Sequence, residues 1–328
     1  MSLTPGKFDT WSREDLIREL EHVQTLGSLI LPRIDRLPSL KNIDYHAAIE
    51  PLAGAVSGDH LIVVNFSDYH LEEKIAKAKS AATPEGDARA AQLKKLFNRF
   101  GILIADAAGH RIGDSLTANF LHGAFKTGVA YELARHGEIT ASLFEMLNTI
   151  FYNRMQEQGL MVGPPYIMTP SVPPYLTLIY GEVRNDGRFR YLSAGHPPPI
   201  VFSQKFDRIV TLYDDRTRAS MPLGIFPSDY HVDIEHFGPV AITKKRYSVN
   251  EINLLGAGDI MLLYTDALIE HERAEGSGTV SFKDARLEQI LRETKSGTAR
   301  EIYSALVNEM RAFAPLDDDL TIAVIKKM

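Results

Sequence analysis

An acidic residue at the end of an apolar strand is the feature that most constrains how this chain can fold. In segment 101–113, Gly-Ile-Leu-Ile-Ala-Asp-Ala-Ala-Gly-His-Arg-Ile-Gly, four apolar residues run into Asp106, and a glycine-bounded turn follows. A buried strand that ends on a carboxylate places this group at the rim of the core, where an unpaired charge is costly. Three more acidic sites lie beside apolar strands, at Asp59, Asp266 and the pair Asp318-Asp319. A bound divalent metal ion is the simplest common explanation for four such sites.

The composition excludes several other kinds of site. The 328 residues include no cysteine, which excludes disulfides, thiolate nucleophiles and cysteine-ligated metal centres. The formal net charge of -6 provides no general attraction to nucleic acid or to an anionic membrane. We see neither a signal-peptide pattern at the start nor an apolar run of the roughly 20 residues that a membrane span needs. We therefore expect a cytoplasmic protein.

The distribution of the acidic motifs predicts one large domain. They run from Asp59 to Asp319, so a single site would need almost the whole chain. We assign residues 41–328 to this domain and residues 1–40 to an N-terminal helical extension. In the extension, Ser12-Arg-Glu-Asp15 resembles a helix capping box, with Asp in place of the usual Glu or Gln. Apolar residues at helical spacing follow, which are Leu16, Leu20, Val23 and Leu26. This helix either packs on its own domain or serves as a homodimer contact or signal-receiving element.

Hydrophobic periodicity predicts a mixture of strands and helices. Strands are expected at 43–49, 61–66, 101–106, 176–183, 189–193, 200–202, 260–264 and 320–325, with a hairpin turn at 185–187. Helices are expected as an exposed pair within 68–99, then from a cap at Asp114 or Ser115, at 139–150, and from a capping box at Thr298 and Glu301. The helix that follows Asp114 should bury Leu116, Phe120, Leu121, Phe125, Val129 and Leu133. The proline-rich residues 159–174 are typical of an irregular loop.

Carboxylates that meet in space match the chemistry of hard divalent cations. Manganese and magnesium prefer oxygen ligands, and a pair of such ions can activate water and hold a phosphoryl group for in-line attack. Without metal the same carboxylates repel, because two unit charges about 4 Å apart cost about 4 kcal/mol at an effective dielectric constant of about 20. A cluster of these acids would therefore imply bound cations.

Six short motifs follow one another along the chain. They are Ser57-Gly58-Asp59, Ile104-Ala-Asp106-Ala-Ala-Gly109-His110, Ser193-Ala-Gly-His-Pro197, Met221-Pro-Leu-Gly224, Gly258-Asp259 with Leu263-Tyr-Thr-Asp266, and Asp318-Asp319-Leu320-Thr321. In this order, over residues 20–328, the chain resembles the bacterial phosphatases of the stage II sporulation protein E type. Those proteins are a branch of the metal-dependent serine/threonine (2C-like) protein phosphatase family.

The resemblance implies a fold class and a metal site. The fold would be α+β, a four-layer α-β-β-α sandwich of two mainly antiparallel sheets flanked by helices. Asp106 would bridge two Mn2+ or Mg2+ ions with help from the Ala107 carbonyl, and Asp59 would bind one of the ions. Asp266 and Asp318 would hold the other ion from the opposite side. Asp319 would then support Asp318 without touching the metal.

Several further polar residues have more than one interpretation. Asp106 and His110 are the catalytic candidates, with His110 either a general acid toward the serine leaving group or a structural residue at a helix entry. His196 and Asp259 lie in turns, where a structural role is expected. An alternating set of polar side chains is expected to form a solvated strand face rather than a metal site, and comprises His231, Asp233 and Glu235.

The resemblance implies hydrolysis of a phosphoserine or phosphothreonine monoester on a regulatory protein by metal-activated water. The substrate class would include an anti-sigma-factor antagonist of a bacterial partner-switching pathway. Three departures from the family pattern, Ser57, His60 and Ala267, keep a second hypothesis open, namely a degenerate scaffold that binds a partner without turnover. A hydrolase of small phosphoesters is the third.

Overall fold

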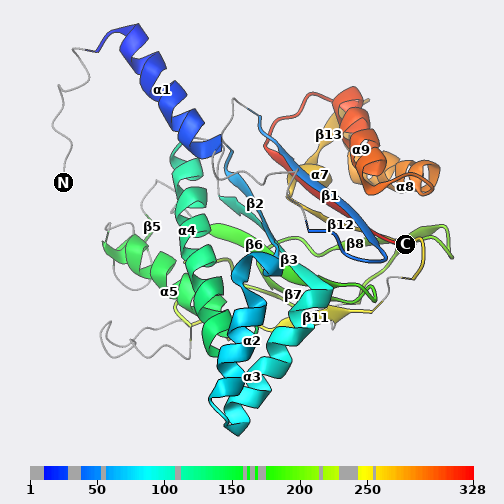
Figure 1. The fold of residues 1–328 in the computed structure, drawn as a ribbon. Coiled ribbons are helices and arrows are strands. Elements are labelled where there is room, and N and C mark those ends of the chain that lie inside the picture. Colours follow the sequence, from blue (N-terminus) through cyan, green and yellow to red (C-terminus); the bar gives the residue numbers. More distant parts are fainter. Residues whose placement is uncertain are drawn as a thin grey trace.

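Two stacked β-sheets occupy the centre of the molecule, and helices cover their outer faces (Figure 1). The structure is a computed structural model. It describes residues 11–28, 38–52, 57–107, 112–157, 161–162, 167–168, 175–213, 217–228, 243–253 and 256–328.

The first sheet contains the apolar strand that ends at Asp106. Its order is β10-β7-β6-β3-β2, and β11 pairs with β7 on the same side as β10. All of these pairs are antiparallel except the short β10–β7 pair. The strands are β2 (Asp59–Val64), β3 (Arg99–Ala107), β6 (Leu176–Arg184), β7 (Phe189–Ala194), β10 (Ala219–Ser220) and β11 (Val249–Ile252).

The second sheet is antiparallel throughout its described strands, with the order β1-β15-β12-β8-β9. Its strands are β1 (Ile43–Glu50), β8 (Ile200–Ser203), β9 (Arg208–Val210), β12 (Ile260–Tyr264) and β15 (Leu320–Lys327). Two small antiparallel ribbons lie outside the sheets, formed by β4 (Met161–Val162) with β5 (Ile167–Met168), and by β13 (Glu272–Glu275) with β14 (Gly278–Ser281).

The helices occupy two outer layers and one extension. They are α1 (Arg13–Ser28), α2 (Leu71–Ser80), α3 (Pro84–Lys95), α4 (Ile112–Arg135), α5 (Ala141–Glu157), α7 (Ala267–Glu270), α8 (Glu288–Thr294) and α9 (Ala299–Phe313). Short helical turns are η2 (Phe66–Tyr69), η3 (Leu96–Asn98) and the π-helical η5 (Lys283–Leu287). The capping box of α9 forms as predicted, with Thr298 and Glu301 bonding each other's backbone N–H.

Three apolar clusters hold the four layers together. Alternate residues of a strand point to opposite faces, so the buried strand β3 contributes to two clusters at once. Ile102 and Ile104 pack between the sheets, while Leu103 packs against the helices outside the first sheet. A third cluster joins the second sheet to α8 and α9. These clusters confirm the predicted α-β-β-α sandwich.

The start of α4 differs from the prediction. The helix begins at Ile112, so neither Asp114 nor Ser115 precedes it as a cap. Leu116, predicted to be buried, is 59% exposed, because the contact of α4 with the core of the first sheet begins only at the following turns. Further along the helix, Phe120 is only half-buried, and the predicted burial of Leu121, Phe125, Val129 and Leu133 is confirmed.

The helix α1 projects from the rest of the molecule (Figure 1). Ser12 and Asp15 form the predicted box at its start, each accepting a backbone N–H of the other. Leu16, Ile17 and Leu20 are 43–44% exposed, so the described part of the chain does not bury the apolar side of α1. The division into an extension and a domain, and a dimer contact through this helix, stay predictions.

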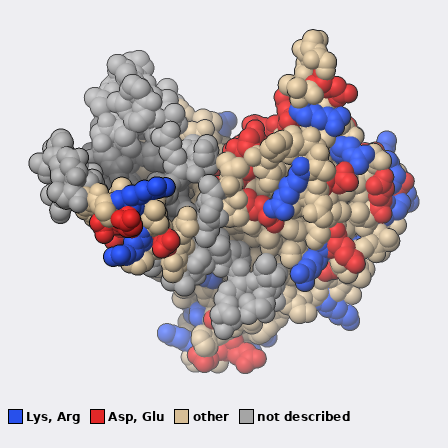
Figure 2. Space-filling view, turned by 90° about the horizontal axis from the view of Figure 1, so that it is seen from above, with Lys and Arg blue, Asp and Glu red and all other residues tan. Residues whose placement is uncertain are grey.

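On the face of the molecule seen in Figure 2, neither sign of charge predominates among the described residues. Acidic and basic side chains are interspersed on the face seen in Figure 2, as expected for the small net charge. None of the described helices combines the length and the apolar character that crossing a membrane would require.

Candidate metal centre

Asp59 and Asp106 face each other across neighbouring strands of the first sheet. In the antiparallel β2–β3 pair, the Cα atoms of these two residues are register partners. Directly opposed residues share one face of a sheet. Two residues further along each strand, Leu61 and Ile104 pack between the two sheets. The two carboxylates therefore lie on the inner face of the first sheet, at the edge of the sandwich.

The second sheet contributes two threonine hydroxyls to the same place. Thr265 follows β12 and Thr321 lies in β15, and both donate to Oδ2 of Asp59, over 2.8 Å and 2.6 Å respectively. Both threonines are fully buried, and Asp59 is only 3% exposed. Both threonines stand within the motifs quoted above, where they were given no role. No local signal marks them, because they act only when the two sheets meet.

Asp319 fastens the segment that leads into β2. Its Oδ1 accepts the backbone N–H of Leu52 over 2.7 Å, and its Oδ2 accepts that of Gly58 over 2.8 Å. The carboxylate of Asp318 in turn accepts the N–H of Asp319 over 2.8 Å. Both oxygens of Asp319 thus accept backbone donors of the segment before β2, and its predicted role as a support of Asp318 stays a prediction.

Two of the departures from the family pattern have simple structural roles. Ser57 accepts the backbone N–H of Asp59 through its hydroxyl over 3.0 Å, and so holds the start of β2. Ala267 begins α7 with a negative φ, so this position does not require glycine. Neither residue disturbs the placement of the acids.

The third departure, His60, points away from the acidic edge. Adjacent residues of a strand face opposite sides, so His60 lies under α4, with its Nε2 2.9 Å from Nδ1 of His122. Burial, followed by the effect of His122, lowers the pKa of His60 to about 3. His60 is therefore a neutral residue of the helix-covered face.

The predicted site residues come together as chain segments. Asp266 directly follows Thr265, which bonds Asp59, and Asp318 directly precedes Asp319, which bonds Gly58. Ala107 donates its N–H to the carbonyl of Gly58 over 3.2 Å. Within the described ranges, however, no three histidine, aspartate or glutamate side chains are grouped closely enough to hold a metal ion. His110 and the set His231, Asp233 and Glu235 lie outside the described residues.

The electrostatics of the acidic edge favour a cation. Burial, and then the negative charge of Asp106, raise the pKa of Asp59 well above its ordinary value, although the two threonine hydroxyls act in the opposite direction. The pKa of Asp266 is raised by burial and by Glu270. Opposed carboxylates with oxygen donors alone fit a hard divalent ion such as manganese or magnesium. The residues present thus suit the predicted metal, and Asp59 and Asp106 are the two carboxylates that the strand register places opposite each other.

The raised pKa of Asp59 predicts how the metal-free protein responds to pH. Folded Asp59 binds its proton more tightly than the unfolded chain, whose value is near 3.8. Its contribution to the unfolding free energy is therefore full below that value and is lost as pH rises through the folded pKa. In urea unfolding with chelator, the stability of the wild type relative to Asp59→Asn should fall as pH increases. A difference that stays constant with pH would contradict this prediction.

His196 is a buried neighbour of the site. Thr177 is the register partner of Asp106 on β6, and its hydroxyl lies 2.9 Å from Nδ1 of His196. The carbonyl of His196 accepts the hydroxyl of Ser193 over 2.9 Å. Burial lowers the pKa of His196 to about 3. These contacts support the predicted structural role of His196 in the turn after β7.

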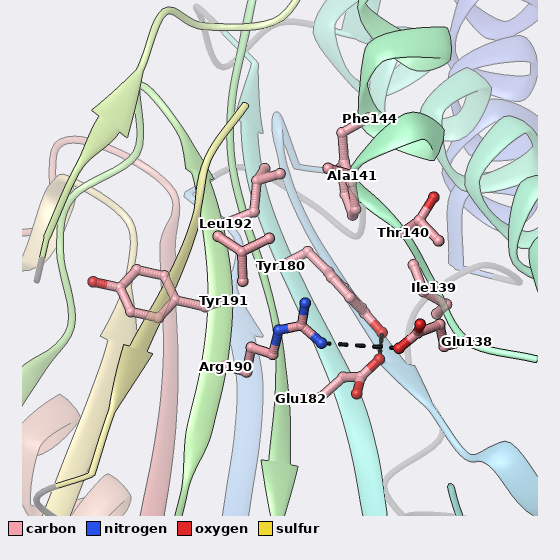
Figure 3. Close-up of a pocket in the computed structure, with 11 residues that line it drawn as sticks. Glu138, Ile139, Thr140, Ala141, Phe144, Tyr180, Glu182, Arg190, Tyr191 and Leu192 are labelled. Carbon is pink, nitrogen blue, oxygen red and sulfur yellow. Dashed lines mark hydrogen bonds and ion pairs between the residues drawn. The ribbon is translucent and has the colours of Figure 1, made fainter. Parts of the chain in front are cut away.

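A separate hollow of about 160 Å³ lies at the other end of the first sheet, between β6, β7, β11 and the start of α5 (Figure 3). Its polar groups include an ion pair of Arg190 with Glu138 at 3.9 Å, and Tyr180, whose hydroxyl donates to Glu182. Glu182 is the register partner of Gly101, five residues from Asp106 along β3. Tyr180, which also lines the hollow, is the register partner of Leu103 and packs in the helix-covered cluster, so the hollow lies on the opposite face of the sheet from Asp106 and is a different site.

The two facing sheets, their helical covers and the acidic edge define the fold of PP2C-type protein phosphatases. The SiaA-PP2C domain of Pseudomonas aeruginosa has this fold, with a TM-score of 0.60, 14% identity and coverage of 96% of this chain and 98% of that one. The RsbU and RsbW domains of a Mycobacterium tuberculosis protein match with a TM-score of 0.55 and 17% identity over 89% of this chain. The phosphatase domain and regulatory fragment of SpoIIE from Bacillus subtilis match with a TM-score of 0.53 and 16% identity over 87% of this chain.

The family is shown by sequence. The model of the stage II sporulation protein E (SpoIIE) family matches residues 98–327, which is well over half of the chain. This chain belongs to that family, and the predicted resemblance is confirmed. The chain spans 61% of the Mycobacterium tuberculosis structure and 62% of the Bacillus subtilis one. No curated protein matches the sequence.

Proposed function

We propose that this protein is a manganese- or magnesium-dependent protein serine/threonine phosphatase. One observation carries the proposal. Asp59 and Asp106 are opposed on the inner face of one sheet, and the second sheet reaches Asp59 through Thr265 and Thr321. The chain belongs to the SpoIIE family, and these residues stand within three of the six motifs, those of Asp59, Asp106 and Asp318, and in the segment that ends at Asp266.

Residues of both sheets would bind the metal ions. Asp59 and Asp106, with the carbonyl of Ala107, would hold the ions from the first sheet, and Asp266 and Asp318 would hold them from the second. When bound, such ions activate a water nucleophile and neutralise charge on the phosphoryl oxygens. Because no protein nucleophile is needed, the side chains contribute positioning and electrostatic stabilisation. His110 stays a predicted proton donor to the leaving serine oxygen.

The proposed substrate is a phosphoserine or phosphothreonine side chain on a cytoplasmic regulatory protein. An anti-sigma-factor antagonist of a partner-switching pathway is the class that the family resemblance implies. The fold also occurs in a protein whose RsbU domain is accompanied by an RsbW domain, which supports a place in signalling. The formal net charge of -6 supports a protein substrate rather than nucleic acid.

The test is phosphate release from p-nitrophenyl phosphate and from a phosphoserine peptide, with manganese, with magnesium and with chelator. We expect turnover that needs metal and that is abolished by chelator. A kinetic preference for nucleotides or sugar phosphates would instead support a small-phosphoester hydrolase. Calorimetry that shows no manganese binding, together with tight binding of a phosphoprotein, would support the scaffold hypothesis.

A further inference from the structure

Thr265 lies at the point where β12 ends and α7 begins, and every polar group of this residue is used. Its N–H donates to the carbonyl of Thr321 over 3.1 Å, and its carbonyl accepts the N–H of Leu268 over 3.1 Å. Its hydroxyl oxygen accepts the N–H of Thr321 over 3.0 Å. A hydroxyl has one proton, so this acceptor role leaves the proton for Oδ2 of Asp59, 2.8 Å away. The backbone of β15 thus orients the Thr265 hydroxyl.

Thr321 provides the second donor from a rigid position. It is the second residue of β15, which has β1 on one side and β12 on the other. Its hydroxyl donates to the same Oδ2 of Asp59 over 2.6 Å, the shorter of the two bonds. Hydrogen bonds to an ionised carboxylate are stronger than those between neutral groups, and two on one oxygen fix the rotation of the carboxylate.

The consequence lies in the other oxygen of Asp59. Among the described residues, both hydrogen bonds to this side chain end on Oδ2, and none ends on Oδ1. The neighbouring charges are those of Asp106 and, to a smaller extent, Asp319, and both repel the carboxylate of Asp59. The carboxylate of Asp59 is therefore held through Oδ2, and Oδ1 accepts no hydrogen bond from the described residues.

We propose that Thr265 and Thr321 are positioning residues of the metal site, which hold Oδ2 of Asp59 and thereby reserve Oδ1 for the divalent cation. This inference rests on the proposed function, because it assigns a metal to Asp59. It also explains how the second sheet completes a site whose central pair lies on the first. Partners that orient a metal ligand commonly contribute 10- to 100-fold to metal affinity.

Thr321→Val is the sharpest variant. Valine has nearly the shape of threonine and lacks the hydroxyl, and that hydroxyl bonds only Asp59 in the described structure. Thr321→Ser is its matched control, because serine keeps the hydroxyl. Thr265→Val additionally removes the acceptor of the Thr321 N–H, so a larger loss of stability is expected for it.

Manganese titration by calorimetry tests the inference. We expect Thr321→Val to weaken manganese binding by about 10- to 100-fold, and Thr321→Ser to stay within about 3-fold of the wild type. Equal manganese affinities of the wild type and Thr321→Val would overturn the inference. If Thr321→Val does not fold, Thr321→Ala against Thr321→Ser makes the same comparison.

A second measurement separates this inference from the proposed function. If the wild type binds no manganese, both the proposed metal site and the role assigned to Oδ1 of Asp59 are wrong. The hydrogen bonds themselves are tested without metal, by the unfolding midpoints of Thr321→Val, Asp59→Ala and the double variant in chelator. We expect Thr321→Val to lower the midpoint more in the wild-type background than in Asp59→Ala. An equal shift in both backgrounds would contradict the hydrogen bonds to Asp59.

Discussion

Asp106→Asn is expected to lower the metal-dependent kcat by on the order of 1000-fold. Asparagine keeps the shape of the side chain and removes the charge that opposes Asp59 across β2 and β3. The same change removes the repulsion that raises the pKa of Asp59. The metal-free variant should therefore be at least as stable as the wild type, and its loss of activity should not reflect unfolding. Phosphate-release kinetics and urea unfolding in chelator measure the two effects.

Asp259→Asn is the matched control for this experiment. Asp259 belongs to one of the quoted motifs, but its carboxylate accepts the N–H groups of Gln204 and Gly256, at the start of β12 and away from the acidic edge. We expect this variant to lose stability and to keep its manganese affinity. Unchanged turnover in Asp106→Asn would contradict the proposed phosphatase.

Glu145→Ala is expected to lower the free energy of unfolding by about 3–5 kcal/mol, because it removes the carboxylate that is paired with a buried cation. Lys244 has a side chain that is 1% exposed, and its Nζ lies 2.9 Å from Oε2 of Glu145. The same ammonium lies 3.4 Å from the centre of the Tyr247 ring. The backbone N–H of Tyr247 donates to Oε1 of Glu145 over 2.6 Å. Urea unfolding at neutral pH measures the loss.

Two variants make this second prediction specific. In Glu145→Ala with Lys244→Met the buried charge is gone, so we expect the double variant to be more stable than Glu145→Ala alone. Glu275→Ala removes an exposed ion pair with Arg273, at 3.6 Å, and should change stability by less than about 1 kcal/mol. A loss in Glu145→Ala no larger than that in Glu275→Ala would show that the pair with Lys244 is unimportant.

Much of the architecture could be predicted because it depends on short-range patterns. The apolar residues before Asp106 indicate a strand buried on both faces, and β3 contributes to two cores. The capping box at Thr298 and the turn at 185–187 are also local, since their hydrogen bonds join residues a few positions apart. The prediction failed at Leu116, because helical spacing continues beyond the turns of α4 that meet the sheet.

The candidate site was only partly predictable. The acids could be recognised, since each ends or precedes an apolar strand and stands within a familiar motif. The register that opposes Asp59 to Asp106 could not, because strand pairing depends on the packing of both faces. The same register places His60 on the opposite face of the sheet, under α4.

The sequence by itself determined the family, the strands and the acids at their ends, because side-chain alternation and turn chemistry are properties of neighbouring residues. Only the tertiary structure decided that Thr265 and Thr321 meet Asp59, across 206 and 262 residues of chain. A hydrogen bond requires two atoms within about 3 Å of each other, and that distance depends on how two complete sheets pack together.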